Sequence, residues 1–212
     1  MQFESDGRTR RRKTDERGGR STPVRRRRFL ETAATAGVAT LAGCGVDPDN
    51  QGQAAAASLT LRSPALDPGT AIPREYTCDG ADVSPPLRID DVPAAAVSLA
   101  LLVDDISTPT DQFTHWVAWN LPPTLTVVPR GIPTTPRPAA LEGGVQGTND
   151  FDDVGYGGPC PPAGDASHTY RFQVFALTER LELTPEAGGA ALLAALDPIL
   201  IATGGFTARY ER

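Results

Sequence analysis

The hydrophobic residues of this chain fall in short runs, which are separated by segments rich in Pro and Gly. The run at 97–103 is nearly continuous, which favours a strand that is buried on both faces. Aromatic and β-branched residues at 113–121 predict a second strong strand. Shorter segments at 58–62, 170–177 and 206–210 predict three more strands. The pattern therefore indicates a mainly β domain.

Helical signals gather only near the C-terminus. The tripeptide Thr184–Glu186 supplies a capping hydroxyl, a proline that fits the first helical position, and a carboxylate that suits the positive end of the helix dipole. An Ala- and Leu-rich run follows to Leu196, where Pro198 breaks or restarts the helix and Gly204–Gly205 ends it. We therefore expect an antiparallel β-sandwich with one or two C-terminal helices.

Charge is distributed unevenly along the chain. Residues 1–43 carry 11 Lys and Arg against 5 Asp and Glu, whereas residues 44–212 carry 9 against 21. The only lysine is Lys13. The acidic domain argues against a nucleic-acid partner, because phosphate binding needs clustered cations. It suits a high-salt, halophilic habitat in which counterions screen self-repulsion, although a codon bias towards Arg would also explain the missing lysines.

The N-terminal segment has the order of an export signal. Four arginines at 25–28 precede a weakly apolar run at 32–41, which is shorter than the roughly 20 residues of a bilayer span. The Arg-Arg-x-Phe-Leu sequence at 26–30 resembles a twin-arginine signal, and the sequence at 41–44 resembles a lipobox that ends in a lipidated Cys44. The predicted organisation is a signal segment at 1–43, a flexible tether at 44–57 and a folded domain at 58–212.

This organisation predicts a lipid-anchored protein on the outer face of the cell membrane. The alternative is a disordered basic tail with a chance cysteine. Two further cysteines, Cys78 and Cys160, are either bridged, as is common in exported domains, or are two separate small core residues.

Polar chemistry gathers in a few segments of the domain. Asp104 and Asp105 end the predicted buried strand, and His115 begins the next strong strand. A Gly-rich stretch leads to the second of the two histidines, His168, and to Tyr170. These acids and histidines also have alternative interpretations that involve no ligand: the acids could be solvated charges at a strand end, and the histidines could be structural.

Five ordered motifs together resemble one known family. They are Asp-Gly-x-Asp-x-Ser-Pro-Pro-Leu at 79–87, Val-Asp-Asp at 103–105, Thr-His-Trp-Val-x-Trp-Asn at 114–120, Gly-x-Asn-Asp-Phe at 147–151, and Gly-Tyr-Gly-Gly-Pro-Cys-Pro-Pro-x-Gly at 155–164 with His-x-Tyr at 168–170. The set resembles the phosphatidylethanolamine-binding protein family, and within it the YbhB/YbcL branch of Raf-kinase-inhibitor-like proteins.

The resemblance implies a β-sandwich with C-terminal helices and a small pocket for phosphate, a carboxylate or a phospholipid head group. In that pocket Gly157 and Gly158 would offer backbone N–H groups, His115 and Tyr170 would donate hydrogen bonds, and Asp105 would fix the histidine network. The ligand-binding residues that it implies are Asp105, Pro109, His115, Gly157, Gly158, Pro159, His168 and Tyr170.

One segment departs from the family pattern. The usual Asp-Pro-Asp-Ala-Pro is here Asp105-Ile106-Ser107-Thr108-Pro109, so that Ser107 replaces the second acid. Loss of that carboxylate should make the pocket less negative, and Ile106 in place of proline should make the loop less rigid.

The resemblance and the residues favour a non-catalytic binding protein that holds a small anionic ligand or regulates a partner protein, with no cofactor and no metal. No Cys-x-x-Cys or His-x₃-His pair indicates a zinc site, and no Gly-x-Ser-x-Gly elbow indicates a serine hydrolase. The alternatives are a protease or kinase inhibitor and a hydrolase built on Asp105, His115 and His168.

Overall fold

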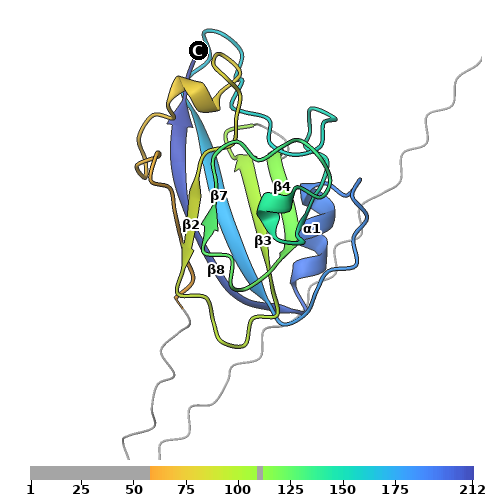
Figure 1. Cartoon of the computed structure of the whole chain (residues 1–212). Coiled ribbons are helices and arrows are strands. Elements are labelled where there is room, and N and C mark those ends of the chain that lie inside the picture. Colours follow the sequence, from red (N-terminus) through yellow and green to blue (C-terminus); the bar gives the residue numbers. More distant parts are fainter. Residues whose placement is uncertain (1–57, 109–111) are drawn as a thin grey trace, which may run out of the picture. The chain divides into compact units, whose positions relative to one another are not determined.

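The computed structural model describes residues 58–108 and 112–212 of the chain (Figure 1). The expected signal segment, the lipidation site at Cys44, the tether and Pro109 lie outside the described residues. Within the described part, no helix combines the length and the apolar character that a membrane crossing needs.

Two antiparallel sheets form the domain. The smaller sheet has the strand order β1-β2-β5, made by Thr60–Arg62, Leu87–Asp90 and Val127–Val128. The larger sheet has the order β6-β4-β3-β7-β8, made by Val145–Gln146, Phe113–Leu121, Ser98–Asp105, His168–Leu177 and Leu200–Tyr210. The helical elements are the short 3₁₀ turns Arg74–Tyr76 and Ala139–Leu141 and the helix α1, Gly189–Leu196.

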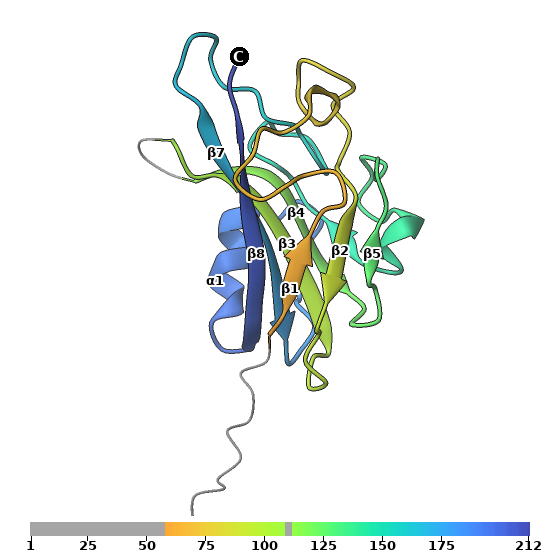
Figure 2. The same cartoon turned by 90° about the vertical axis from the view of Figure 1, so that its left-hand side faces the viewer.

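The larger sheet is covered on both faces (Figures 1 and 2). Strand β3 divides its side chains accordingly, because successive residues of a strand point to opposite faces. Leu99, Leu101 and Val103 join the core between the two sheets, whereas Ala100 and Leu102 join the core beneath α1. The nearly continuous apolar run in the sequence is thus a strand buried on both faces. The prediction of a mainly β, antiparallel sandwich with a C-terminal helix is confirmed.

The start of the helix differs from its prediction. Helix α1 begins at Gly189 with Gly188 as its N-cap in extended conformation, whereas the residues from Thr184 form only a turn that is closed by the Ala187 N–H to the Thr184 carbonyl, 2.9 Å. A Cβ atom at Gly189 would collide with the Thr114 hydroxyl of β4. Glycine therefore lets the first turn of α1 approach the sheet, and this packing overrides the capping signal at Thr184.

The predicted end of the helix was also wrong. Gly204 and Gly205 lie inside the long strand β8, and the helix already ends at Leu196. A Cβ atom at Gly204 would collide with the carbonyl of Leu59, where the chain enters β1, and one at Gly205 would collide with the carbonyl of Phe172 in β7. The two glycines therefore permit close backbone approach rather than a helix stop.

Candidate functional site

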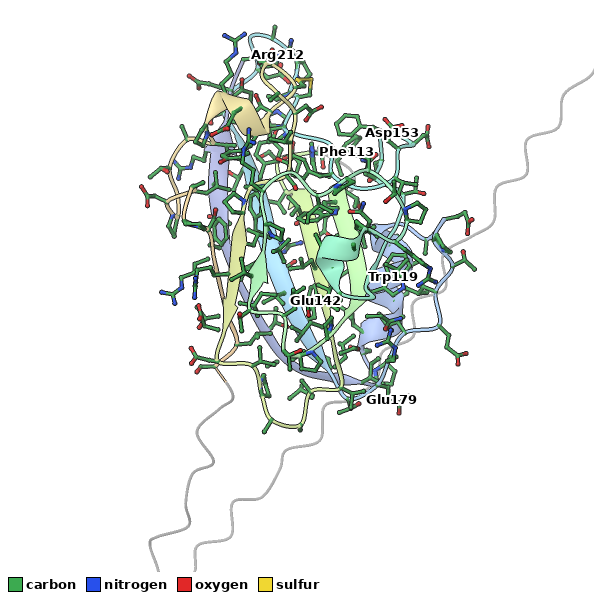
Figure 3. All side chains as sticks on the ribbon, in the orientation of Figure 1. Phe113, Trp119, Glu142, Asp153, Glu179 and Arg212 are labelled. Atoms are coloured by element: carbon green, nitrogen blue, oxygen red, sulfur yellow. A yellow bond between two sulfur atoms is a disulfide. The ribbon has the colours of Figure 1, made fainter. Side chains whose placement is uncertain are left out.

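A pocket of about 230 Å³ opens at one end of the larger sheet. Figure 3 shows Phe113, which lines this pocket, at the same end of the domain as Arg212, and shows Glu179 at the opposite end. The pocket is lined by Asp105, Thr108, Phe113, His115, Phe151, Cys160, Pro161, Pro162, His168 and Tyr170. Four of the residues that the sequence implicated, Asp105, His115, His168 and Tyr170, are thus brought together.

Strand register brings the polar residues to one place. Asp105, the last residue of β3, pairs with Phe113 at the start of β4 and with Tyr170 near the start of β7. His168 is the first residue of β7. Antiparallel neighbours therefore deliver the end of one strand and the beginnings of two others to the same edge of the sheet.

A β-bulge directs His115 into the pocket. Asp104 pairs with Thr114 and Val103 pairs with Trp116, which leaves His115 as the additional residue of β4. Trp116 belongs to the core between the sheets, and the His115 ring lies 5.1 Å from the Tyr170 ring, edge to face. The bulge places His115 on the same side of the sheet as Trp116, where strict alternation would have turned it away.

Asp105 is the centre of the hydrogen-bond network. Its side chain is only 6% exposed, and one oxygen accepts a 2.6 Å bond from the Nδ1–H of His168 while the other accepts the Ser107 N–H at 2.8 Å. Asp104 is buried as well and is bound to Arg171. The interpretation of these acids as solvated charges at a strand end is therefore wrong.

Ser107, which replaces the second acid of the family pattern, does not line the pocket. Its hydroxyl accepts the N–H of Thr169 at 2.8 Å, and its own N–H binds Asp105. The residue thus ties the loop after β3 to the beginning of β7. The expected loosening of this loop is countered by these bonds and by the Ile106 N–H, which donates to the Thr169 carbonyl at 3.0 Å.

His115 presents one free ring nitrogen. Its Nδ1–H donates to the Gly157 carbonyl at 2.7 Å, so that the neutral ring carries its lone pair on Nε2. No described residue forms a hydrogen bond with Nε2. Burial lowers the pKa of His115, and the carbonyls of Gly157 and Gly158 and the charge of Asp105 only partly oppose this effect. The ring is therefore neutral at neutral pH.

Tyr170 supplies a hydroxyl without a partner. The residue is 1% exposed, it lines the pocket, and its hydroxyl oxygen forms no hydrogen bond with a described residue. Burial, the nearby charge of Asp105 and the approach of the hydroxyl to the Asp105 carboxylate raise the pKa of this hydroxyl far above its ordinary range, so the proton stays on the oxygen. A buried hydroxyl that makes no close hydrogen bond to a described residue can donate to a group that enters the pocket.

The glycines of the Gly-rich stretch do not have free N–H groups. The Gly157 N–H donates to the His115 carbonyl at 2.9 Å, and the Gly158 N–H donates to Asp82 at 2.7 Å. Neither glycine lines the 230 Å³ pocket, and nor does Pro159. Both N–H groups bind the loop's own neighbours instead of pointing into this pocket. That these residues hold a ligand stays a prediction.

Cys78 and Cys160 form a disulfide with a Cα–Cα distance of 5.4 Å. Three hydrogen bonds join the same two loops, from Cys78 N–H to the Pro159 carbonyl, from Gly158 N–H to Asp82, and from the Tyr156 hydroxyl to the Tyr76 carbonyl. Cys160 and Phe151 line both the pocket and a second cavity of about 500 Å³, which Cys78 also lines. The bridge therefore lies where the two cavities share lining residues.

Several lining residues were not singled out from the sequence, namely Phe113, Phe151, Thr108, Pro161 and Pro162. Phe151 stacks edge to face on Phe113 and His115, at 4.8 and 5.3 Å. Asn149 holds its loop in place by accepting the N–H groups of Phe151 and Asp153. The signal in the sequence for this turn is Asn149 itself, because Asn side chains often bind the backbone two residues further on.

The described lining residues of the pocket include no Arg or Lys side chain. Asp165 adds a further carboxylate 3.8 Å from Nε2 of His168. No three His, Cys, Asp or Glu side chains of residues 58–108 and 112–212 are arranged to share a metal ion. The site is an aromatic-walled pocket with one buried hydroxyl donor and one imidazole acceptor.

The fold and the site together define a pocket-bearing antiparallel β-sandwich. Residues 62–211 match the model of the family described as phosphatidylethanolamine-binding protein. The chain therefore belongs to the phosphatidylethanolamine-binding protein family.

Relatives and solved structures agree with this assignment. A UPF0098 protein of Pyrococcus abyssi is 44% identical over 141 residues, covering 66% of this chain and 79% of the relative. A UPF0098 protein of Methanothermobacter thermautotrophicus is 40% identical over 154 residues, covering 73% of this chain and 99% of the relative. The structure of E. coli YbcL is similar with a TM-score of 0.67 and 33% identity, covering 73% of this chain and 98% of YbcL. The structure of a putative phosphatidylethanolamine-binding protein homologue of Chlamydia trachomatis is similar with a TM-score of 0.64 and 35% identity, covering 74% of this chain and 99% of the homologue.

Proposed function

We propose that this protein is a non-catalytic binding protein whose pocket holds the oxyacid group of a small ligand, a phosphate or a carboxylate. The observation that carries the proposal is the buried Tyr170 hydroxyl, which is fixed in the pocket wall and has no partner among the described residues. An ionised ligand oxygen would accept its proton and remove the free-energy penalty of an unpaired buried group.

The size and the walls of the pocket support a ligand fragment rather than a large molecule. About 230 Å³ is below the range of roughly 300–1,000 Å³ that drug-sized ligands occupy. The rings of Phe113 and Phe151 flank His115, and Phe151 is 40% exposed at the rim. The group that enters is therefore compact, with the rest of the ligand outside.

Three further features belong to the proposal. The segment at 1–43 exports the protein by the twin-arginine route, Cys44 anchors it by a lipid to the outer face of the cell membrane, and the acidic domain works at high salt. The disulfide fits an exported domain. It also oxidises Cys160, the one cysteine among the described lining residues of the pocket, which supports a non-catalytic role.

The first test is a thermal-shift titration of the full chain with phosphate, acetate and phosphoethanolamine at high salt. A ligand at about 100 times its Kd should stabilise the protein by about 2.7 kcal/mol, which raises Tm by several degrees. Tyr170→Phe should abolish this shift, because it removes the hydroxyl donor.

Tyr156→Phe is the matched control for this titration. The Tyr156 hydroxyl is also buried, but it donates to the Tyr76 carbonyl at 2.7 Å and does not line the 230 Å³ pocket. The control should lower the Tm of the free protein, because it leaves that carbonyl unpaired, and should keep the ligand shift. If no ligand shifts the wild type, or if Tyr170→Phe retains the full shift, the proposed function is wrong.

A further inference from the structure

Strand β8 forms an outer edge of the larger sheet, where β7 is its only neighbour in the described strand order. Alternate residues of an antiparallel strand point their backbone N–H and C=O groups toward the same side. On the side that faces away from β7, Thr207 and Arg209 form backbone hydrogen bonds with the segment at 69–72. This segment therefore acts as a partner strand for the C-terminal part of β8 (Figure 2).

The next part of this edge has no such partner. By the same alternation, the backbone groups of Gly205 and Thr203 point away from β7, and no described segment forms a backbone hydrogen bond with them on that side. Both residues are exposed. Unpaired N–H and C=O groups on an exposed edge are a template on which another strand can form.

The middle of β8 also carries little of the protection that is usual for an edge strand. Natural proteins place charged side chains or proline on exposed edges to prevent pairing with other chains. Residues 199–208 include no Asp, Glu, Lys, Arg or Pro, although residues 44–212 carry 9 Lys and Arg and 21 Asp and Glu. A bulge at Ile201 shortens the regular edge but lies beyond Thr203 and Gly205. An uncharged stretch is thus exposed on an acidic domain.

We propose that β8 pairs with β8 of a second copy of this chain, antiparallel and about a two-fold axis, so that the larger sheets of the two copies become continuous. Charge favours a second copy as the occupant, because a two-fold interface places each surface patch against itself. Acidic patches of two such domains repel each other, so an uncharged edge is favoured as their point of contact. The inference goes beyond the proposed function and does not depend on the ligand.

A hollow beside the edge fits this pairing. It has a volume of about 300 Å³, and its lining includes Arg171, Gln173, Thr203 and Gly205. A Cβ atom at Gly205 would collide with the carbonyl of Phe172, so this position cannot fill the hollow with a side chain. With Thr203 opposite Gly205 of the second copy, each threonine side chain would lie at the hollow of the other copy. The two residues would also exchange their free backbone hydrogen bonds.

The geometry of the pair has two consequences. Tyr170 in the ligand pocket pairs with Ala208 near the C-terminal end of β8, and a two-fold axis reverses the strand, so the two pockets would lie at opposite ends of the pair. A contact through one strand edge is small compared with the roughly 1,200–2,000 Å² of stable complexes, so the affinity should be weak. It should increase with salt, because counterions screen the repulsion between two acidic domains.

Sedimentation velocity of the full chain tests the association, in a Cys44→Ser background so that no disulfide can link two copies. We expect monomers at about 1 µM and dimers at about 1 mM protein. The apparent Kd should be several-fold lower in about 1 M salt than in about 0.1 M salt. A chain that stays monomeric at about 1 mM in both salts would overturn the inference.

Thr203→Lys and Thr124→Lys form a matched pair of variants. Both threonines are exposed and both changes add the same charge, but Thr124 lies in the turn between β4 and β5. Thr203→Lys should raise the Kd about tenfold or more, because two lysines would approach each other across the two-fold axis. Thr124→Lys should not raise it, because this change only makes the domain less acidic. Equal Kd values for the two variants would contradict pairing through β8.

Amide hydrogen exchange, followed by NMR, locates the contact. The amides of Thr203 and Gly205 should exchange about tenfold more slowly at a concentration where about 90% of the copies are paired. The Arg209 amide, which donates to the Thr70 carbonyl at 2.8 Å, should be protected at every concentration.

Two results of the exchange experiment would identify a different occupant or a different surface. Protection of Thr203 and Gly205 that does not depend on concentration would mean that the tether at 44–57 of the same chain covers the edge. Association without protection of these two amides would place the interface elsewhere on the domain. Either result would overturn the pairing of β8 with a second copy.

Discussion

Arg171→Met is expected to lower the free energy of unfolding by about 3 kcal/mol, as measured by urea denaturation of the full chain at neutral pH. Arg171 on β7 contacts Asp104 on β3 through two nitrogens, at 3.1 and 2.5 Å, across a register pair of the larger sheet. The Asp104 side chain is 1% exposed. Removing its partner would leave a buried carboxylate without a counter-charge, which costs far more than the net gain from the pair.

The same substitution at an exposed pair is the control. Arg62 on β1 binds Asp90 on β2 at 2.9 and 2.7 Å, but the Arg62 side chain is 61% exposed. Because water replaces the lost contacts there, Arg62→Met should cost less than about 1 kcal/mol. The comparison therefore tests mainly the effect of burial, since both pairs join an Arg and an Asp on neighbouring strands.

The double variant Asp104→Leu with Arg171→Met checks the cause. It should recover most of the lost stability, because no buried charge remains without a partner. If Arg171→Met is as mild as Arg62→Met, or if the double variant is no more stable than Arg171→Met alone, the loss does not come from an unpaired buried carboxylate. The side chain of Gln112 is a further partner: with its oxygen towards Arg171 it accepts at 2.7 Å and donates to Asp104 at 3.3 Å.

The larger sheet could be predicted from the sequence because burial on both faces leaves a clear pattern. The apolar run at 97–103 became β3, and the segment at 113–121 became β4 with the predicted bounds. The short strands β5 and β6 have two residues each, which is too few for any periodicity to show. Gly204 and Gly205 gave a misleading signal because they serve close packing, and such packing depends on distant segments.

The members of the site could be named from motifs, but their arrangement could not. The bulge at His115 depends on how β4 pairs with β3, and no local pattern shows which residue is the additional one. The Gly-rich motif likewise suggested free N–H groups, yet those of Gly157 and Gly158 are bound to His115 and Asp82. Both differences come from contacts between residues far apart in the sequence, which decide whether a polar group faces a ligand or another part of the protein.

Loss of the disulfide should lower the free energy of unfolding by about 2–4 kcal/mol, because the bridge closes a long loop in the unfolded chain, between cysteines that are 82 residues apart in the sequence. Cys78→Ala with Cys160→Ala tests this by urea denaturation, in a Cys44→Ser background that prevents exchange with the remaining thiol. The hydrogen bonds from Cys78 N–H to Pro159 and from Tyr156 to Tyr76 are retained, so the folded state and the pocket should persist.

Reductant provides the control for this prediction, since it should bring the bridged protein to the midpoint of the double alanine variant and leave that variant unchanged. Thiol labelling of the denatured, unreduced protein in the same background should find no free thiol at Cys78 or Cys160. Equal midpoints with and without reductant, after labelling has verified the bridge, would mean that the native contacts between the two loops already restrain the chain. In that case the stabilising role would belong to those hydrogen bonds, and the bridge would serve mainly to hold Cys160 where the two cavities share lining residues.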